Sequence, residues 1–107
     1  MAVNFENINQ MAMEYATDVS RELPVDKAVL FGSYAKGYAN EQSDIDICFF
    51  LKNYNGKRRV DILAQILGIG GEKYHGAFFE PIVFETDEMQ KGNPFIQEIL
   101  ATGVELL

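Results

Sequence analysis

The segment from Asp44 to Leu51, DIDICFFL, is the feature that most constrains how this chain folds. Its residues alternate with the period of two that is typical of a β-strand. One side of the predicted strand carries Ile45, Ile47, Phe49 and Leu51, and the other side carries Asp44, Asp46, Cys48 and Phe50. The two aspartates therefore share one face of the strand.

Two other apolar runs predict further strands. The run from Lys27 to Gly32 ends in glycine, which is typical of a buried strand followed by a tight turn. The run from Phe78 to Phe84 contains Pro81, which assigns that strand to an edge or to a bulge because proline lacks a backbone N–H.

Apolar residues at helical spacing predict the helices between these strands. The first is expected over residues 8–23, where Pro24 stops the pattern, and a short one follows Ser33. A third is expected over residues 57–67, before the glycines of GIGGEKYHG, and a last one between Asn93 and Gly103. The order predicts one α/β or α+β domain over residues 1–107, with a small mixed sheet flanked by helices.

The composition fits one folded core and narrows the classes of function. The chain has 107 residues, of which 48% are hydrophobic, and its net charge is -7. That charge disfavours general nucleic-acid binding, and it suits binding of divalent cations or of a basic protein partner. The alternative is that the negative charge only keeps the protein soluble. The single cysteine, Cys48, excludes an intramolecular disulfide and a Cys-based zinc site. With no signal peptide or apolar run long enough to span a membrane, we expect a cytoplasmic protein.

The turn after the first predicted strand has the residues of a phosphate site. Gly32 lets a phosphate approach the backbone, and the N–H groups at a helix start attract anions. Ser33 adds a hydroxyl donor and Lys36 a positive charge. Two alternatives remain open, namely that Ser33 is only a helix N-cap and that Lys36 is only a surface charge.

The predicted strand that follows has the residues of a metal site. Side chains two residues apart on a strand project the same way with Cα atoms about 6.6 Å apart, so Asp44 and Asp46 can both ligate one Mg²⁺ ion. A third carboxylate from a neighbouring strand would complete a two-metal site. Glu80 is the best candidate, since it would share a face with the apolar Phe78, Ile82 and Phe84, but it is also open to interpretation as a surface glutamate.

The motif Gly32-Ser33, followed after ten residues by Asp44-Ile45-Asp46, resembles the signature of the DNA polymerase beta-like nucleotidyltransferase superfamily. In particular, FGSYAKGYANEQSDIDI resembles the minimal nucleotidyltransferase (MNT) family. Two positions depart from the pattern: Glu80 stands where aspartate is commoner, and Lys36 stands where arginine is frequent.

The resemblance implies the nucleotidyltransferase fold and a reaction in which a hydroxyl attacks the α-phosphate of ATP or another nucleoside triphosphate. It implies Mg²⁺ or Mn²⁺ held by Asp44, Asp46 and Glu80, with Gly32, Ser33, Lys36 and Asp44 binding the nucleotide. It also implies a helical HEPN-type toxin as protein partner, with this chain as its antitoxin. Because the chain carries no acceptor domain of its own, we expect the acceptor on another polypeptide. The alternative is a catalytically weak module that neutralises a partner by contact alone.

The remaining polar residues have simpler interpretations. Asp61 is the rival of Glu80, but it falls within a helical pattern and is expected to be solvated. The basic run Lys57 to Arg59 is typical of a solvated helix end. The glycines from Gly68 to Gly71 follow a helix rather than a strand, unlike a phosphate loop, and His75 has no second metal ligand near it in the sequence.

Overall fold

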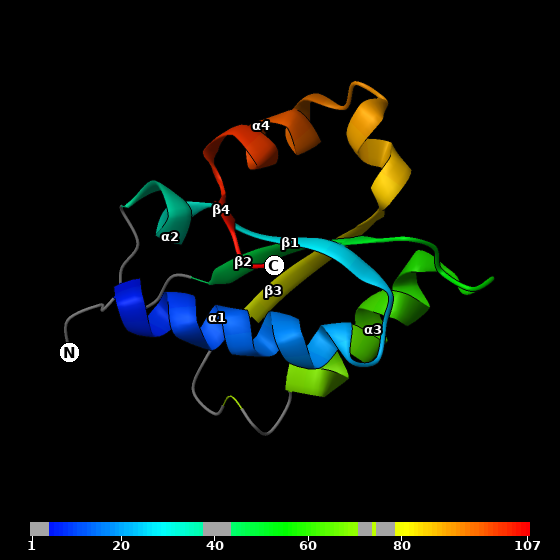
Figure 1. Cartoon of the computed structure of the whole chain (residues 1–107), viewed down its shortest axis with the longest axis horizontal. Helices are drawn as coiled ribbons and strands as arrows, with labels where there is room; N and C mark the ends of the chain where they lie inside the picture. Colours follow the sequence, from blue (N-terminus) through cyan, green and yellow to red (C-terminus); the bar gives the residue numbers. More distant parts are fainter. Residues whose placement is uncertain (1–4, 38–43, 71–73, 75–78) are drawn as a thin grey trace.

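The computed structural model describes residues 5–37, 44–70, 74 and 79–107. Its elements in chain order are α1 (Phe5–Ser20), β1 (Val25–Phe31), α2 (Ser33–Lys36), β2 (Ile45–Leu51), α3 (Arg59–Gly70), β3 (Phe79–Glu85), η1 (Thr86–Gln90), α4 (Pro94–Thr102) and β4 (Val104–Glu105). The expected α/β class, with a small mixed sheet flanked by helices, is confirmed (Figure 1). None of the helices in these ranges is long and apolar enough to cross a membrane.

The strands form one sheet in the order β3-β2-β1-β4. β1 pairs antiparallel with both β2 and β4, whereas β2 pairs parallel with β3. Parallel neighbours need a crossover connection, and α3 supplies it between β2 and β3. β3 lies at an edge of the sheet, which confirms the position that Pro81 predicted.

Helices cover both faces of the sheet. In Figure 1, α1 and α3 lie on one side of the strands and α4 on the other. The central strand β2 is buried on both faces, and its alternation is the predicted one: the side chains of Ile45, Ile47, Phe49 and Leu51 face the larger core, and those of Cys48 and Phe50 face the smaller core under α4. Burial of each large apolar side chain contributes about 1.5–3 kcal/mol, so this strand is fixed from both sides.

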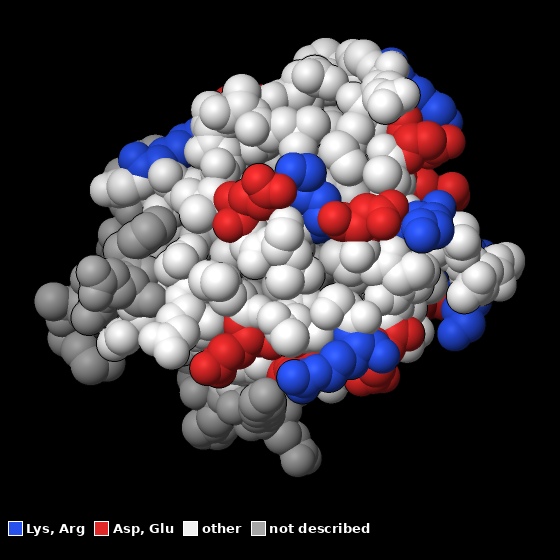
Figure 2. Space-filling model, viewed as in Figure 1, with Lys and Arg blue, Asp and Glu red and all other residues white. Residues whose placement is uncertain are grey.

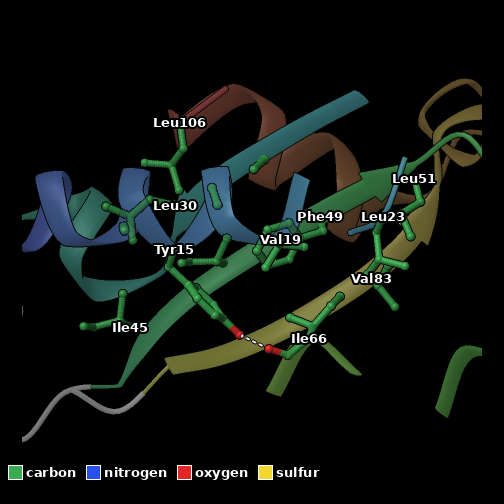
Figure 3. Close-up of a cluster of buried hydrophobic side chains, with 14 of the residues drawn as sticks. Tyr15, Val19, Leu23, Leu30, Ile45, Phe49, Leu51, Ile66, Val83 and Leu106 are labelled. Carbon is green, nitrogen blue, oxygen red and sulfur yellow. Dashed lines mark hydrogen bonds between the residues drawn. The ribbon is translucent and has the colours of Figure 1, made fainter. Parts of the chain in front are cut away.

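Tyr15 of α1 is the centre of the larger core (Figure 3). Its ring stacks on Phe79 with centroids 4.3 Å apart, and its hydroxyl donates a hydrogen bond of 2.7 Å to the carbonyl oxygen of Ile66. This bond satisfies the one polar atom of a fully buried side chain and ties α1 to α3.

Several element boundaries differ from those that the sequence predicts. α3 continues to Gly70 instead of ending before Gly68. A Cβ at position 70 would lie 2.8 Å from Cε1 of Tyr15, so this glycine lets the helix pass close to the ring, and packing outweighs the low helix propensity of glycine. The strand β2 begins at Ile45, one residue after Asp44. η1 and the two-residue β4 are not predicted at all, because neither has a periodic pattern.

The turn between β1 and α2 brings Gly32 against β2. Gly32 has φ 74° and ψ -148°, a backbone conformation that is open essentially to glycine alone. A Cβ at this position would also collide with Oδ2 of Asp46. The glycine is therefore required twice, once by its own backbone and once by the carboxylate that lies beside it.

We expect Gly32→Ala to lower the free energy of unfolding by about 2 kcal/mol or more, because it adds steric overlap with Asp46 to backbone strain. Gly37→Ala is the matched control, since Gly37 also has a positive φ, 86°, but has open space where the Cβ would lie. The control is expected to cost about 1 kcal/mol, from the strain of an L-residue in the left-handed region alone. Denaturant unfolding of both variants measures the difference, and equal losses would contradict the contact between Gly32 and Asp46.

Candidate active site

Three residues from three strands form a row across the face of the sheet that α4 covers. Asp46 of β2 is the antiparallel partner of Phe31 in β1 and the parallel partner of Glu80 in β3. Directly paired residues of neighbouring strands project from the same face, with Cβ atoms about 5 Å apart. Glu80 therefore lies beside Asp46, as expected from the sequence, and it shares its face with Ile82 and Phe84. Phe78, the fourth residue expected there, lies outside the described residues.

The proximity of these carboxylates changes the protonation of Asp46. Partial burial, then the negative charges of Glu80 and Asp44, and then a hydrogen bond with the Glu80 side chain raise the pKa of Asp46 from 3.8 to about 6. Asp44 precedes β2, is exposed, and is close enough to Asp46 to contribute to this shift. A carboxylate whose pKa is raised by neighbouring carboxylates is typical of sites that bind a cation or move a proton.

The carboxylate oxygens of Asp46 and Glu80 suit a hard cation such as Mg²⁺. This ion takes one or two carboxylates from a protein and completes its coordination shell with water and substrate phosphate. Asp46 and Glu80 fit this requirement as an adjacent pair. Within the described parts of the chain, no set of three or more His, Cys, Asp or Glu side chains is gathered to hold a metal ion. A site that includes Asp44 as third ligand stays a prediction.

The Gly32-Ser33 turn lies next to the carboxylate of Asp46, as the contact of Gly32 with Asp46 shows. Gly32 itself is the N-cap of α2, so the alternative that Ser33 is the N-cap is wrong; Ser33 is the first helical residue. Lys36 ends this short helix, and its Nζ lies 3.4 Å from Oε1 of Glu98 in α4. Lys36 is thus near the turn, although its ammonium group faces a carboxylate in this structure.

The other polar residues lie elsewhere. Asp61 is exposed on α3 and is bound by Arg58, which confirms that it is solvated and removes it as the rival of Glu80. Arg59 does more than the expected solvated helix end, because it contacts Glu88 at 3.2 Å and lies over the ring of Phe84. Gly71 and His75 lie outside the described residues.

A small cleft lies beside Asp46, and the sequence did not predict it. It has a volume of about 200 Å³ and lies between the end of β1, α2 and α4. Its lining residues are Phe31, Gly32, Lys36, Phe95, Glu98, Ile99 and Thr102. Phe95 of α4 is 47% exposed. Sequence periodicity contains no signal for such a cleft, because its walls come from segments about sixty residues apart.

The shift of Asp46 predicts a measurable pH effect on the protein in the absence of metal. The pKa of Asp46 in the folded protein, about 6, lies above its ordinary value of 3.8, so the folded state holds the proton more tightly than the unfolded chain does. The contribution of protonated Asp46 to the free energy of unfolding is fully present below about pH 4 and is lost as the pH rises through about 6. Asp46→Asn cannot ionise, so at pH 7.5 and without metal the variant should melt at a higher temperature than the wild type.

Thermal unfolding of both proteins in a chelating buffer between pH 4 and pH 8 measures this effect. The difference in Tm between Asp46→Asn and wild type should grow with pH and level off above about 6. A difference that does not change with pH would contradict the electrostatic description of this site.

Comparisons with known proteins agree with the fold and the motif. The family model described as a nucleotidyltransferase domain matches residues 12–100. A protein of Methanocaldococcus jannaschii named as a putative protein adenylyltransferase is 29% identical over 101 residues, which cover 92% of this chain and 98% of that protein.

A solved structure has the same fold. The crystal structure of a putative nucleotidyltransferase from Sulfolobus solfataricus superimposes with a TM-score of 0.59 at 17% sequence identity, covering 94% of this chain and 80% of that one. The family match extends from α1 to α4 and includes Gly32, Ser33, Asp44, Asp46 and Glu80. The chain therefore belongs to the nucleotidyltransferase domain family, within the polymerase beta-like superfamily.

Proposed function

We propose that this nucleotidyltransferase depends on Mg²⁺ and transfers AMP from ATP to a hydroxyl group of a partner protein, as the MNT-type antitoxin of a HEPN toxin. The observation that carries the enzymatic part is the pairing of Asp46 with Glu80 across β2 and β3, directly beside the Gly32-Ser33 turn. It brings carboxylates for an ion and a turn for phosphate to the same end of the sheet.

In the proposed reaction the acceptor hydroxyl oxygen forms a bond to the α-phosphorus of ATP. The bond from that phosphorus to the bridging oxygen of the β-phosphate breaks, and pyrophosphate leaves with the electron pair. A bound Mg²⁺ would neutralise charge on the phosphate oxygens and on the carboxylates. Asp44 and Asp46 would hold the ion. Glu80 would either accept the hydroxyl proton itself or add a ligand to the ion, in which case the proton passes to water.

The phosphate side of the proposed site is the turn after β1. Gly32 leaves room for a phosphate at the backbone, and the Ser33 hydroxyl is a donor at the start of α2. Lys36 would exchange Glu98 for the triphosphate, because an ion pair of two partly exposed side chains at 3.4 Å is weak and a triphosphate carries more charge.

A protein acceptor is supported by the M. jannaschii relative, whose name describes a protein adenylyltransferase and which aligns over nearly the whole chain. The HEPN partner rests on the resemblance of residues 31–47 to the MNT motif. On the face shown in Figure 2, acidic and basic side chains alternate instead of forming a basic patch, so steering of RNA or DNA to this face is not expected.

The enzymatic proposal is tested with Glu80→Gln. We expect the rate of AMP transfer to fall by about 10² to 10⁴-fold, the range for removal of a positioned proton acceptor. The release of pyrophosphate from ATP in the presence of Mg²⁺ and the partner measures the rate. Asp61→Asn is the control, because this carboxylate is exposed on α3 and pairs with Arg58. The rate of this variant should match that of the wild type.

An unaltered rate in Glu80→Gln would leave Glu80 a structural residue. Binding is measured separately: Mg²⁺ together with ATP should raise the Tm of the wild type, since a ligand that binds only the folded state stabilises it. Asp46→Asn should remove this joint effect. A wild type with no ATP-dependent shift at saturating Mg²⁺ would refute the enzymatic proposal.

The protein acceptor is tested by intact-mass spectrometry of the protein encoded next to this one. After incubation with ATP and Mg²⁺, the partner should gain the mass of one or more AMP groups on Tyr, Ser or Thr hydroxyls. Asp44→Asn should abolish the gain without preventing copurification. Tight copurification with no added mass would instead favour neutralisation by contact alone, and the absence of both would leave a transferase that acts on small molecules.

A further inference from the structure

The cleft between α2 and α4 adjoins the proposed reaction centre. One wall is Phe31, the residue that pairs directly with Asp46 across β1 and β2. Gly32, which also lines the cleft, contacts the Asp46 carboxylate. A group seated in this cleft therefore lies on one side of Asp46, while Glu80 lies on the other.

The size of the cleft restricts its occupant. Pockets that enclose a drug-sized ligand measure about 300 to 1,000 Å³, whereas this cleft measures about 200 Å³. It has room for one planar ring system and not for a whole nucleotide. A nucleotide that uses it must keep its phosphates outside, and the Gly32-Ser33 turn is at its border.

The walls of the cleft suit an aromatic ring. Phe31 and Phe95 meet edge to face, with centroids 6.0 Å apart and planes at 88°. Such a contact uses the face of only one of the two rings, so aromatic faces remain for a third ring. Phe95 is 47% exposed although it lies on the helix that covers the sheet, which makes its ring accessible from solvent. Ile99 adds apolar surface deeper in the cleft.

We propose that this cleft binds the nucleobase of the nucleoside triphosphate, with Phe95 as its stacking surface. The proposal rests on the proposed function, because it assigns the base of the same nucleotide whose phosphates bind at Gly32 and Ser33. The base stacks in the cleft, the triphosphate follows the turn, and the α-phosphate comes to Asp46 between them. Lys36 and Glu98, which pair at the rim of the cleft, lie where the phosphates leave it.

Calorimetric titration with two ligands tests this assignment without relying on catalysis. One ligand is an ATP analogue whose α,β-bridging oxygen is replaced by methylene, and the other is inorganic tripolyphosphate, both with Mg²⁺. Stacking of one base on an aromatic side chain should make the analogue bind about 10- to 100-fold more tightly than tripolyphosphate. Phe95→Ala should remove most of this preference and leave the Kd for tripolyphosphate unchanged.

Leu67→Ala is the matched control. Leu67 is a large apolar residue of similar exposure, 52%, on α3 at the opposite face of the sheet, and its removal should leave both Kd values unchanged. Phe95→Trp gives a direct signal because the chain contains no other tryptophan. Its fluorescence should be quenched by the analogue and not by tripolyphosphate, and the analogue should keep its preference.

The outcomes separate this inference from the proposed function. Equal affinity of the wild type for both ligands, or a preference that survives Phe95→Ala, would overturn the nucleobase site while leaving transfer by Asp46 and Glu80 intact. A preference that depends on Phe95, together with a partner that gains no nucleotide mass, would support the nucleobase site and refute the protein acceptor. A wild type that binds neither ligand would overturn both.

Discussion

The register of β2 between β1 and β3 is the constraint on which the rest of this molecule depends. A slip of one residue would turn Asp46 toward the larger core and would bring Ile45 or Ile47 to the face beside Glu80. The apolar side chains of β2 oppose such a slip because both faces of the strand are buried. The same residues that form the core thus fix the position of the carboxylate, so stability and the geometry of the site have one origin.

The carboxylates of the candidate site destabilise the same sheet that holds them in position. Burial and the negative charges of Glu80 and Asp44 raise the pKa of Asp46, so the carboxylates oppose folding when Asp46 is ionised. The two apolar cores hold the strands in place regardless, through Phe49 on one face and Phe50 on the other. Local electrostatic strain carried by a well-packed sheet is typical of a site selected for ligand binding.

The features with a local or periodic signal are predictable from the sequence. The alternation of DIDICFFL predicted both faces of β2, Pro81 predicted an edge strand, and Asn93 and Pro94 predicted the start of α4. The adjacency of Glu80 and Asp46 followed from placing one carboxylate on each of two strands. The ion pair between Lys36 and Glu98, the cleft and β4 were missed, because each depends on how the last twelve or so residues dock on the end of β1, and no local pattern encodes that contact.

The packing of α4 on the sheet sets the shape of the proposed nucleobase cleft. Phe95, Glu98 and Thr102 recur at the spacing of one helical stripe and line the cleft. Ile96 and Ile99 are buried against the sheet, and Ile99 also borders the cleft. Docking of the buried stripe therefore sets the distance between Phe95 and Phe31, and with it the width of the cleft. A substitution that weakens the packing of Ile96 would widen the cleft without changing any residue proposed to contact the nucleobase. In the proposed site, nucleotide affinity would in this way be linked to the packing of the smaller core, on the same face of the sheet that carries Asp46 and Glu80.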